Sequence, residues 1–90
     1  MPLFVVNRTL PGITPDALMS AGVRAKTCCA EMTQEGESVR WVRSFFVPAT
    51  EQTHCYFEAA SKEAVEEANN RAKIPFVDVA EVVEMTPEAV

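Results

Sequence analysis

Two neighbouring stretches of this chain carry large apolar residues at both odd and even positions, and they constrain the fold more than any other feature. The stretches run from Val39 to Val47 and from Thr53 to Ala60. Successive side chains of a strand point to opposite faces, so each stretch has apolar groups to bury on two faces. The chain supplies helices for only one face. The sequence therefore predicts that a partner subunit covers the other face.

The segments before these strands predict a strand followed by a helix. Residues 3–9 are mostly apolar and are followed by a loop at Pro11 and Gly12. Thr14 is a suitable cap for the free amides of a helix that begins at Pro15, because proline is tolerated in the first turn. Apolar residues then recur at intervals of three and four, which predicts one buried stripe. The stripe consists of Leu18, Ala21, Ala25, Cys28 and Met32.

The second half of the chain predicts a hairpin, a helix and a final strand. Residues 48–52 are few enough to join the two apolar stretches as antiparallel strands. Ser61 is a suitable cap for a helix that ends before Pro75. The valine-rich residues 77–85 predict the last strand, with a bulge near Glu81. The order of elements predicts one α+β domain over residues 1–90, with the ferredoxin-like βαββαβ topology, a four-stranded antiparallel sheet and two helices on one face.

The hairpin also allows the two faces of the sheet to be assigned. If Val47 lies opposite His54, Arg43 faces Glu58 and neutralises it. One face then mixes aromatic and charged groups, as an interface or a ligand cleft does. This mixed face contains Trp41, Arg43, Phe45, Val47, His54, Tyr56, Glu58 and Ala60. The opposite, smaller and more apolar set is assigned to the helix side, and it contains Val42, Ser44, Phe46, Cys55, Phe57 and Ala59.

Composition and charge exclude several classes of protein. A net charge of −5 repels a phosphate backbone, so a nucleic-acid partner is not expected. No apolar run approaches the roughly 20 residues that span a bilayer, and no basic region precedes the first apolar run, as it would in a signal peptide. We therefore expect a cytoplasmic protein without a membrane partner. In that compartment its 3 cysteines are expected to be free thiols.

Few residues offer recognisable site chemistry. The chain has no glycine-rich phosphate loop, zinc signature or nucleophile elbow, and its first loop lacks the paired cysteines of a metal chaperone. His54 is the only histidine, so one subunit cannot build an all-histidine metal site, although a dimer supplies a second copy. Glu81 interrupts an apolar strand, where an acid costs free energy unless it is paired or exposed. Glu81 is therefore a candidate proton carrier.

Five short segments of the chain form a recognisable pattern when they are taken together. They are Trp41-Val42-Arg43-Ser44, Cys55-Tyr56-Phe57-Glu58-Ala59, Glu63-Ala64-Val65-Glu66-Glu67, Pro75 and Val79-Ala80-Glu81-Val82. This pattern resembles a family of small bacterial proteins that are grouped as a domain of unknown function and include a nickel-binding member. The resemblance covers about the last 50 residues well and the first 35 mainly by element order. The resemblance implies a ferredoxin-like homodimer, an assembly like the dimeric α+β barrels, and a nickel or other transition-metal cofactor.

Two departures from the family pattern bear on that metal. Members commonly have histidine where this chain has Arg43, and again where it has Ala68. A guanidinium is always charged and offers no lone pair to a metal ion. Arg43 would instead suit a small anionic ligand.

Three functional hypotheses follow from the residues and the resemblance. The first is a homodimeric binding protein for a metal ion or a small anion. Its site residues would be Trp41, Arg43, Tyr56 and Glu58, with His54 as the candidate metal ligand. The second is a small cofactor-free enzyme of the dimeric α+β barrel type, in which Glu81 or His54 moves a proton. The third is a structural or regulatory dimerisation module.

Overall fold

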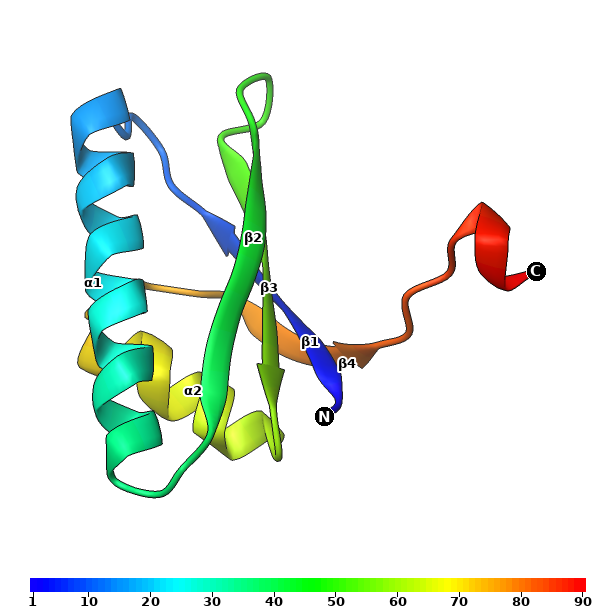
Figure 1. Cartoon of the computed structure of the whole chain (residues 1–90). Coiled ribbons are helices and arrows are strands. Elements are labelled where there is room, and N and C mark those ends of the chain that lie inside the picture. The colour runs from blue at the N-terminus through cyan, green and yellow to red at the C-terminus, as the bar shows by residue number, and fades with distance from the viewer.

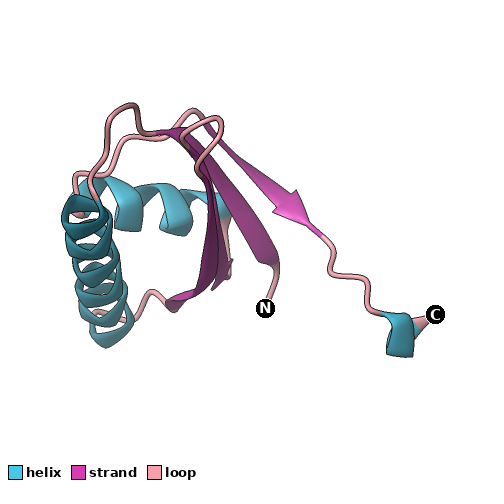
Figure 2. Ribbon diagram, turned by 90° about the horizontal axis from the view of Figure 1, so that it is seen from above, coloured by secondary structure: helices cyan, strands magenta, loops and turns pink.

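The computed structural model describes all residues from 1 to 90 and contains four strands and two α-helices (Figure 1). The elements are β1 (Leu3–Thr9), α1 (Pro15–Gln34), β2 (Val39–Val47), β3 (Gln52–Ala59), α2 (Lys62–Arg71) and β4 (Asp78–Val82). The strands form one sheet in the order β2-β3-β1-β4, and all neighbours are antiparallel. Both helices lie on the same face of this sheet (Figure 2). These features confirm the ferredoxin-like α+β fold.

Both helices begin at the predicted capping residues. The hydroxyl of Thr14 accepts a hydrogen bond of 3.1 Å from the amide of Ala17, and Ser61 accepts one of 3.1 Å from Ala64. These bonds satisfy amides that have no partner within the helix. Neither helix combines the length and the hydropathy that are needed to cross a membrane.

The buried stripe of α1 differs from the predicted one at two positions, and at the first of them Leu18 is only partly buried. Ala21, Ala25 and Met32 are buried as predicted, but Cys29 is buried in place of Cys28, which is only half-buried. The two adjacent side chains diverge by about 100° around the helix, so only one of them can point at the sheet. Cys28 instead packs against the smaller apolar cluster between α1 and α2.

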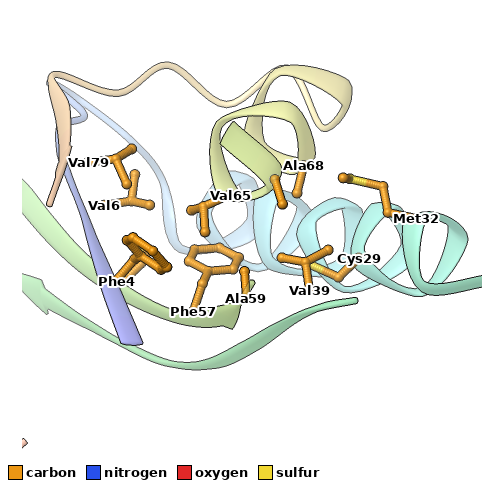
Figure 3. Packing of buried hydrophobic residues seen from close by; sticks show 12 residues of the cluster. Phe4, Val6, Cys29, Met32, Val39, Phe57, Ala59, Val65, Ala68 and Val79 are labelled. Atoms are coloured by element: carbon orange, nitrogen blue, oxygen red, sulfur yellow. The ribbon is translucent and has the colours of Figure 1, made fainter. Parts of the chain in front are cut away.

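The main core lies between the sheet and the two helices (Figure 3). Phe57, on β3, is its largest fully buried side chain, and Val65 points toward its ring from α2. The alternate residues Phe4 and Val6 face the same core from β1. Because side chains alternate along a strand, this arrangement determines which residues of every strand face the helices.

The pairing of β2 with β3 corrects the predicted register. Phe45 lies opposite His54 and Arg43 opposite Tyr56, so the true register is shifted by two residues from the predicted one. Since a shift of two residues keeps every side chain on its face, the assignment of Arg43 survives. A bulge between Trp41 and Arg43 then changes the alternation, and Trp41 lies opposite the buried Phe57. Trp41 is therefore on the helix side, contrary to the prediction.

The last strand is shorter and more regular than predicted. β4 ends at Val82, and its pairing with β1 runs without the bulge that was expected near Glu81. Beyond it, residues 83–90 extend away from the domain and end in a single 3₁₀ turn (Figures 1 and 2). We call residues 83–90 the C-terminal arm. Its three large apolar side chains are all at least 75% exposed, and they are Val83, Met85 and Val90.

Candidate functional sites on the two faces of the sheet

The face of the sheet that points away from the helices has no cover within the chain (Figure 2). We call it the open face. The strand registers give it the following residues: Leu3, Val5, Asn7, Thr9, Arg40, Arg43, Phe45, Val47, Gln52, His54, Tyr56, Glu58, Asp78, Ala80 and Val82. Four of the residues predicted to form a site, Arg43, His54, Tyr56 and Glu58, are therefore on one face.

Arg43 and Tyr56 share a cavity on the open face. The cavity has a volume of about 310 Å³, and Leu3, Phe45 and Glu84 also line it. The rings of Phe45 and Tyr56 meet edge to face, with their centroids 6.3 Å apart and an interplanar angle of 78°. This geometry is favourable for aromatic pairs. Phe45 and Tyr56 therefore form a partly exposed aromatic wall in the cavity that Arg43 also lines.

Glu58 pairs with a different arginine from the predicted one. The Nε of Arg40, directly opposite in the ladder, donates a hydrogen bond of 3.0 Å to Glu58 Oε1. This ion pair is one of three in the chain, and none of the three includes Arg43. The shifted register explains the change of partner, because it places Arg43 opposite Tyr56. The charge of Arg43 is left available for a ligand.

His54 is the end of a chain of polar side chains that crosses three strands. Asn7 Nδ2 donates a hydrogen bond of 2.8 Å to Asp78 Oδ1 on β4. The same amide presents its Oδ1 to the Nδ1 atom of His54 at 2.8 Å. An amide oxygen only accepts, so the proton of the neutral imidazole belongs on Nδ1. The Nε2 atom then carries the lone pair.

Trp41 lies on the helix side, where it contacts α1. Its indole Nε1 donates a hydrogen bond of 2.9 Å to Ser44 Oγ, and its ring packs against the main core. The ring approaches α1 at Gly22, where a Cβ atom would lie 3.3 Å from the ring. The missing side chain at Gly22 thus allows the helix to approach β2 closely. Trp41 does not belong to the open-face group.

The remaining predicted residues are not brought together. Glu81 is exposed on the edge strand β4, and it lies opposite Phe4 in the ladder. Neither Glu81 nor His54 lines the open-face cavity of about 310 Å³. Ala68 is buried in the core under α2, whereas Arg43 is on the open face. Arg43 and Ala68, the two positions at which the family resemblance led us to expect histidine, therefore lie on opposite sides of the sheet.

A second cavity, of about 400 Å³, lies between α1 and the β2 and β3 strands. Its lining is mostly apolar, but it includes the buried residues Arg8 and Thr53. Neither residue was predicted from the sequence to belong to a site. The alternation Phe4, Val6, Arg8 was the available signal, because it places an arginine at an inward position of β1.

Of the three cysteines, only Cys55 lines one of the two cavities. All three are free thiols, and both Cys29 and Cys55 are buried. Burial raises the pKa of Cys29 to about 11, although a hydrogen bond with the Trp41 backbone opposes the rise. Cys29 is therefore a protonated core side chain at neutral pH. No group of three histidine, cysteine or acidic side chains in the chain is arranged to hold a metal ion.

Comparisons with known proteins identify the relatives of this chain. A search of curated proteins finds no match. Among solved structures, the crystal structure of SCO4226 from Streptomyces coelicolor A3(2) matches with a TM-score of 0.75 and 25% identity, covering 93% of this chain and 99% of that one. The sequence profile of the family described as "Nickel responsive protein SCO4226-like" matches residues 4–82. The chain therefore belongs to the SCO4226-like family of nickel responsive proteins.

Proposed function

We propose that this protein is a homodimeric metal-binding protein in which Nε2 of His54 is a ligand for nickel or a similar divalent transition metal. The main support for this proposal is the chain of hydrogen bonds that runs from His54 through Asn7 to Asp78. A histidine that binds a metal usually donates its other ring N–H to an oxygen acceptor, which fixes its tautomer and its orientation. The Oδ1 atom of Asn7 provides this acceptor. The imidazole nitrogen is a ligand type that nickel favours.

A second subunit would supply further metal ligands that one chain lacks. A single histidine does not complete a coordination sphere, and no group of three ligand side chains exists in the monomer. A two-fold axis through the open face would bring in a second His54 with its own Asn7 and Asp78. Phe45 is 58% exposed on that face, which favours burial against a partner. The C-terminal arm extends beyond the domain and offers additional apolar side chains for the same contact.

The metal proposal is tested by calorimetric titration of nickel into protein purified without a histidine tag. We expect saturable binding by the natural chain and its loss in His54→Ala. Asn7→Ala keeps the ligand but removes the group that orients it, so nickel binding should weaken about 10- to 100-fold. Asn70→Ala, which changes an exposed asparagine of α2, is the matched control and should leave the affinity unchanged. Equal affinity of His54→Ala and the natural chain would refute the proposal.

A small anion is the second candidate ligand of the open face. Its support is Arg43, whose guanidinium has no ion-pair partner and borders the cavity of about 310 Å³. Tyr56 supplies a hydroxyl on the same cavity wall. Titration with inorganic phosphate tests this ligand. Arg43→Gln should abolish any saturable signal, and Arg40→Gln is the control because Arg40 already pairs with Glu58.

A further inference from the structure

Arg8 is a buried charge that has only neutral partners. The residue is 4% exposed, on the helix side of β1. Its Nη1 donates a hydrogen bond of 3.2 Å to the carbonyl of Pro75, and its Nη2 donates one of 2.8 Å to Asn69 Oδ1. None of the three ion pairs in the chain includes it. Buried arginines are normally paired with an anion, so the lack of one at Arg8 requires an explanation.

Thr53 is a second incompletely satisfied group, directly opposite Arg8 in the β1–β3 ladder. Thr53 is 2% exposed, and its Oγ1 is the one buried side-chain nitrogen or oxygen atom of the chain without a hydrogen-bond partner. A buried hydroxyl without a partner is costly and is rare in native proteins. Valine has the same shape without the hydroxyl, so a valine at position 53 would avoid the cost of the unsatisfied group. The ladder therefore places two incompletely compensated polar residues next to each other on the helix side of the sheet.

Both residues line the cavity of about 400 Å³ beneath α1. We call it the α1 cavity. Its size falls within the roughly 300 to 1,000 Å³ that is typical of small-molecule sites, and such sites combine apolar walls with a few polar groups. Eleven of its 16 lining residues are hydrophobic. They include Leu18, Met19 and Val23 from α1, and Trp41 and Phe46 from β2.

We propose that the α1 cavity binds an apolar monocarboxylate, with its carboxylate at Arg8 and Thr53 and its hydrocarbon part between α1 and β2. A guanidinium presents N–H groups in a planar fork that matches a carboxylate. The Thr53 hydroxyl would donate to the same anion and so lose its unsatisfied state. One buried positive charge matches one negative charge. Lys26 also lines the cavity, but it is exposed and therefore lies at the entrance.

The site is independent of the metal site proposed above. His54 and Asn7 are on the open face, whereas Thr53 alternates with His54 and faces the helices. The two proposals can therefore fail separately. His54→Ala should abolish nickel binding and leave carboxylate binding unchanged.

The chain carries its own reporter for this test, because Trp41 is the single tryptophan and lines the α1 cavity. Octanoate, kept below its micellar concentration, is titrated into the full chain while tryptophan emission is recorded. We expect a saturable change in emission. Octanol, which has the same hydrocarbon chain without the charge, should bind at least tenfold more weakly. The absence of a saturable change up to the solubility limit of octanoate would overturn the proposal, and so would equal affinity for octanol.

Two variants locate the carboxylate. Thr53→Val removes only the unsatisfied hydroxyl, so the protein should fold normally and bind octanoate about tenfold more weakly. Arg8→Lys keeps the charge but loses the fork, and it should also weaken binding at least tenfold. Thr27→Val, at an exposed position of α1, is the matched control and should bind like the natural chain. Unchanged affinity in folded Thr53→Val, verified by circular dichroism, would refute the assignment.

Discussion

A single extra residue in β2 decides the role of Trp41. Without the bulge, the alternation of β2 would keep Trp41 on the same face as Arg43, which is the open face. With the bulge, the indole packs against the core and against Gly22 of α1. The exposed aromatic side chain of the open face is instead Phe45, four positions further along the strand. Trp41 and Phe45, which both belong to β2, therefore serve different surfaces.

Trp41→Ala should destabilise the fold without weakening self-association. Removing a large aromatic side chain from a core costs about 3 to 5 kcal/mol, and the half-buried position of Trp41 reduces the expected loss to roughly 2 to 3 kcal/mol. The free energy of unfolding in urea measures this effect. Sedimentation at a temperature where the variant remains folded measures association. A weakened dimer with unchanged folding stability would contradict the assignment of Trp41 to the helix side.

At the scale of elements, the two helices are joined at their C-terminal ends by a cluster of charges. Arg71, at the end of α2, donates hydrogen bonds of 3.0 and 2.8 Å to Glu35, which caps the end of α1. Its Nε also donates a hydrogen bond of 2.7 Å to Glu67, four residues earlier in α2. The hydrogen bonds from Arg71 lower the pKa of Glu35. The arginine thereby couples two elements that are far apart in sequence.

The contribution of Glu35 to stability should depend on pH. Its pKa is lower in the folded chain than the ordinary value of 4.5, so its contribution is fully present above that value. The contribution is lost as the pH falls through the lowered folded-state pKa. Glu35→Gln should therefore be less stable than the natural chain at neutral pH, and the difference should shrink in acid. Urea unfolding at both pH values measures it, and Glu37→Gln, which removes an exposed acid without an ion pair, is the control. A difference that is independent of pH would contradict this account.

At the scale of the whole molecule, the sheet has one face covered by helices and one that is open (Figure 2). The covered side holds the main core and the α1 cavity, whereas the open face carries exposed aromatic groups and the polar chain that ends at His54. The C-terminal arm adds apolar surface that the rest of the chain does not cover. A dimer through the open face would bury both features, and it would bring the two copies of His54 to a shared interface.

Phe45→Ala should weaken this dimer and leave the fold intact. A central aromatic anchor contributes about 2 kcal/mol or more to association, which corresponds to roughly a 30-fold loss of affinity. Sedimentation over a range of concentrations measures the loss. Trp41→Ala is the matched control, since it removes an aromatic group from the opposite face of the same strand. Unchanged association of Phe45→Ala, or a natural chain that sediments as a 9.9 kDa monomer, would refute the open-face dimer.

The elements were predictable because their signals are local. Each signal lies within a few residues of the helix or hairpin that it specifies. These signals are the caps at Thr14 and Ser61, the spacing of apolar residues along α1 and the turn after Val47. The open-face position of His54 and Tyr56 was predictable as well, because alternate residues of β3 lie on the same face of the sheet. The predictions failed at Trp41 and at the partner of Glu58. A bulge depends on how two strands fit together, and no local sequence signal specified it.

Sequence alone was enough to predict the order of elements and the topology, because periodicity and capping act over short distances along the chain. The tertiary structure decided which groups meet. It placed Asn7 between His54 and Asp78, and it placed Arg8 opposite Thr53 in a cavity under α1. These contacts join residues more than 40 positions apart, so only the register of the strands and the packing of the helices could specify them.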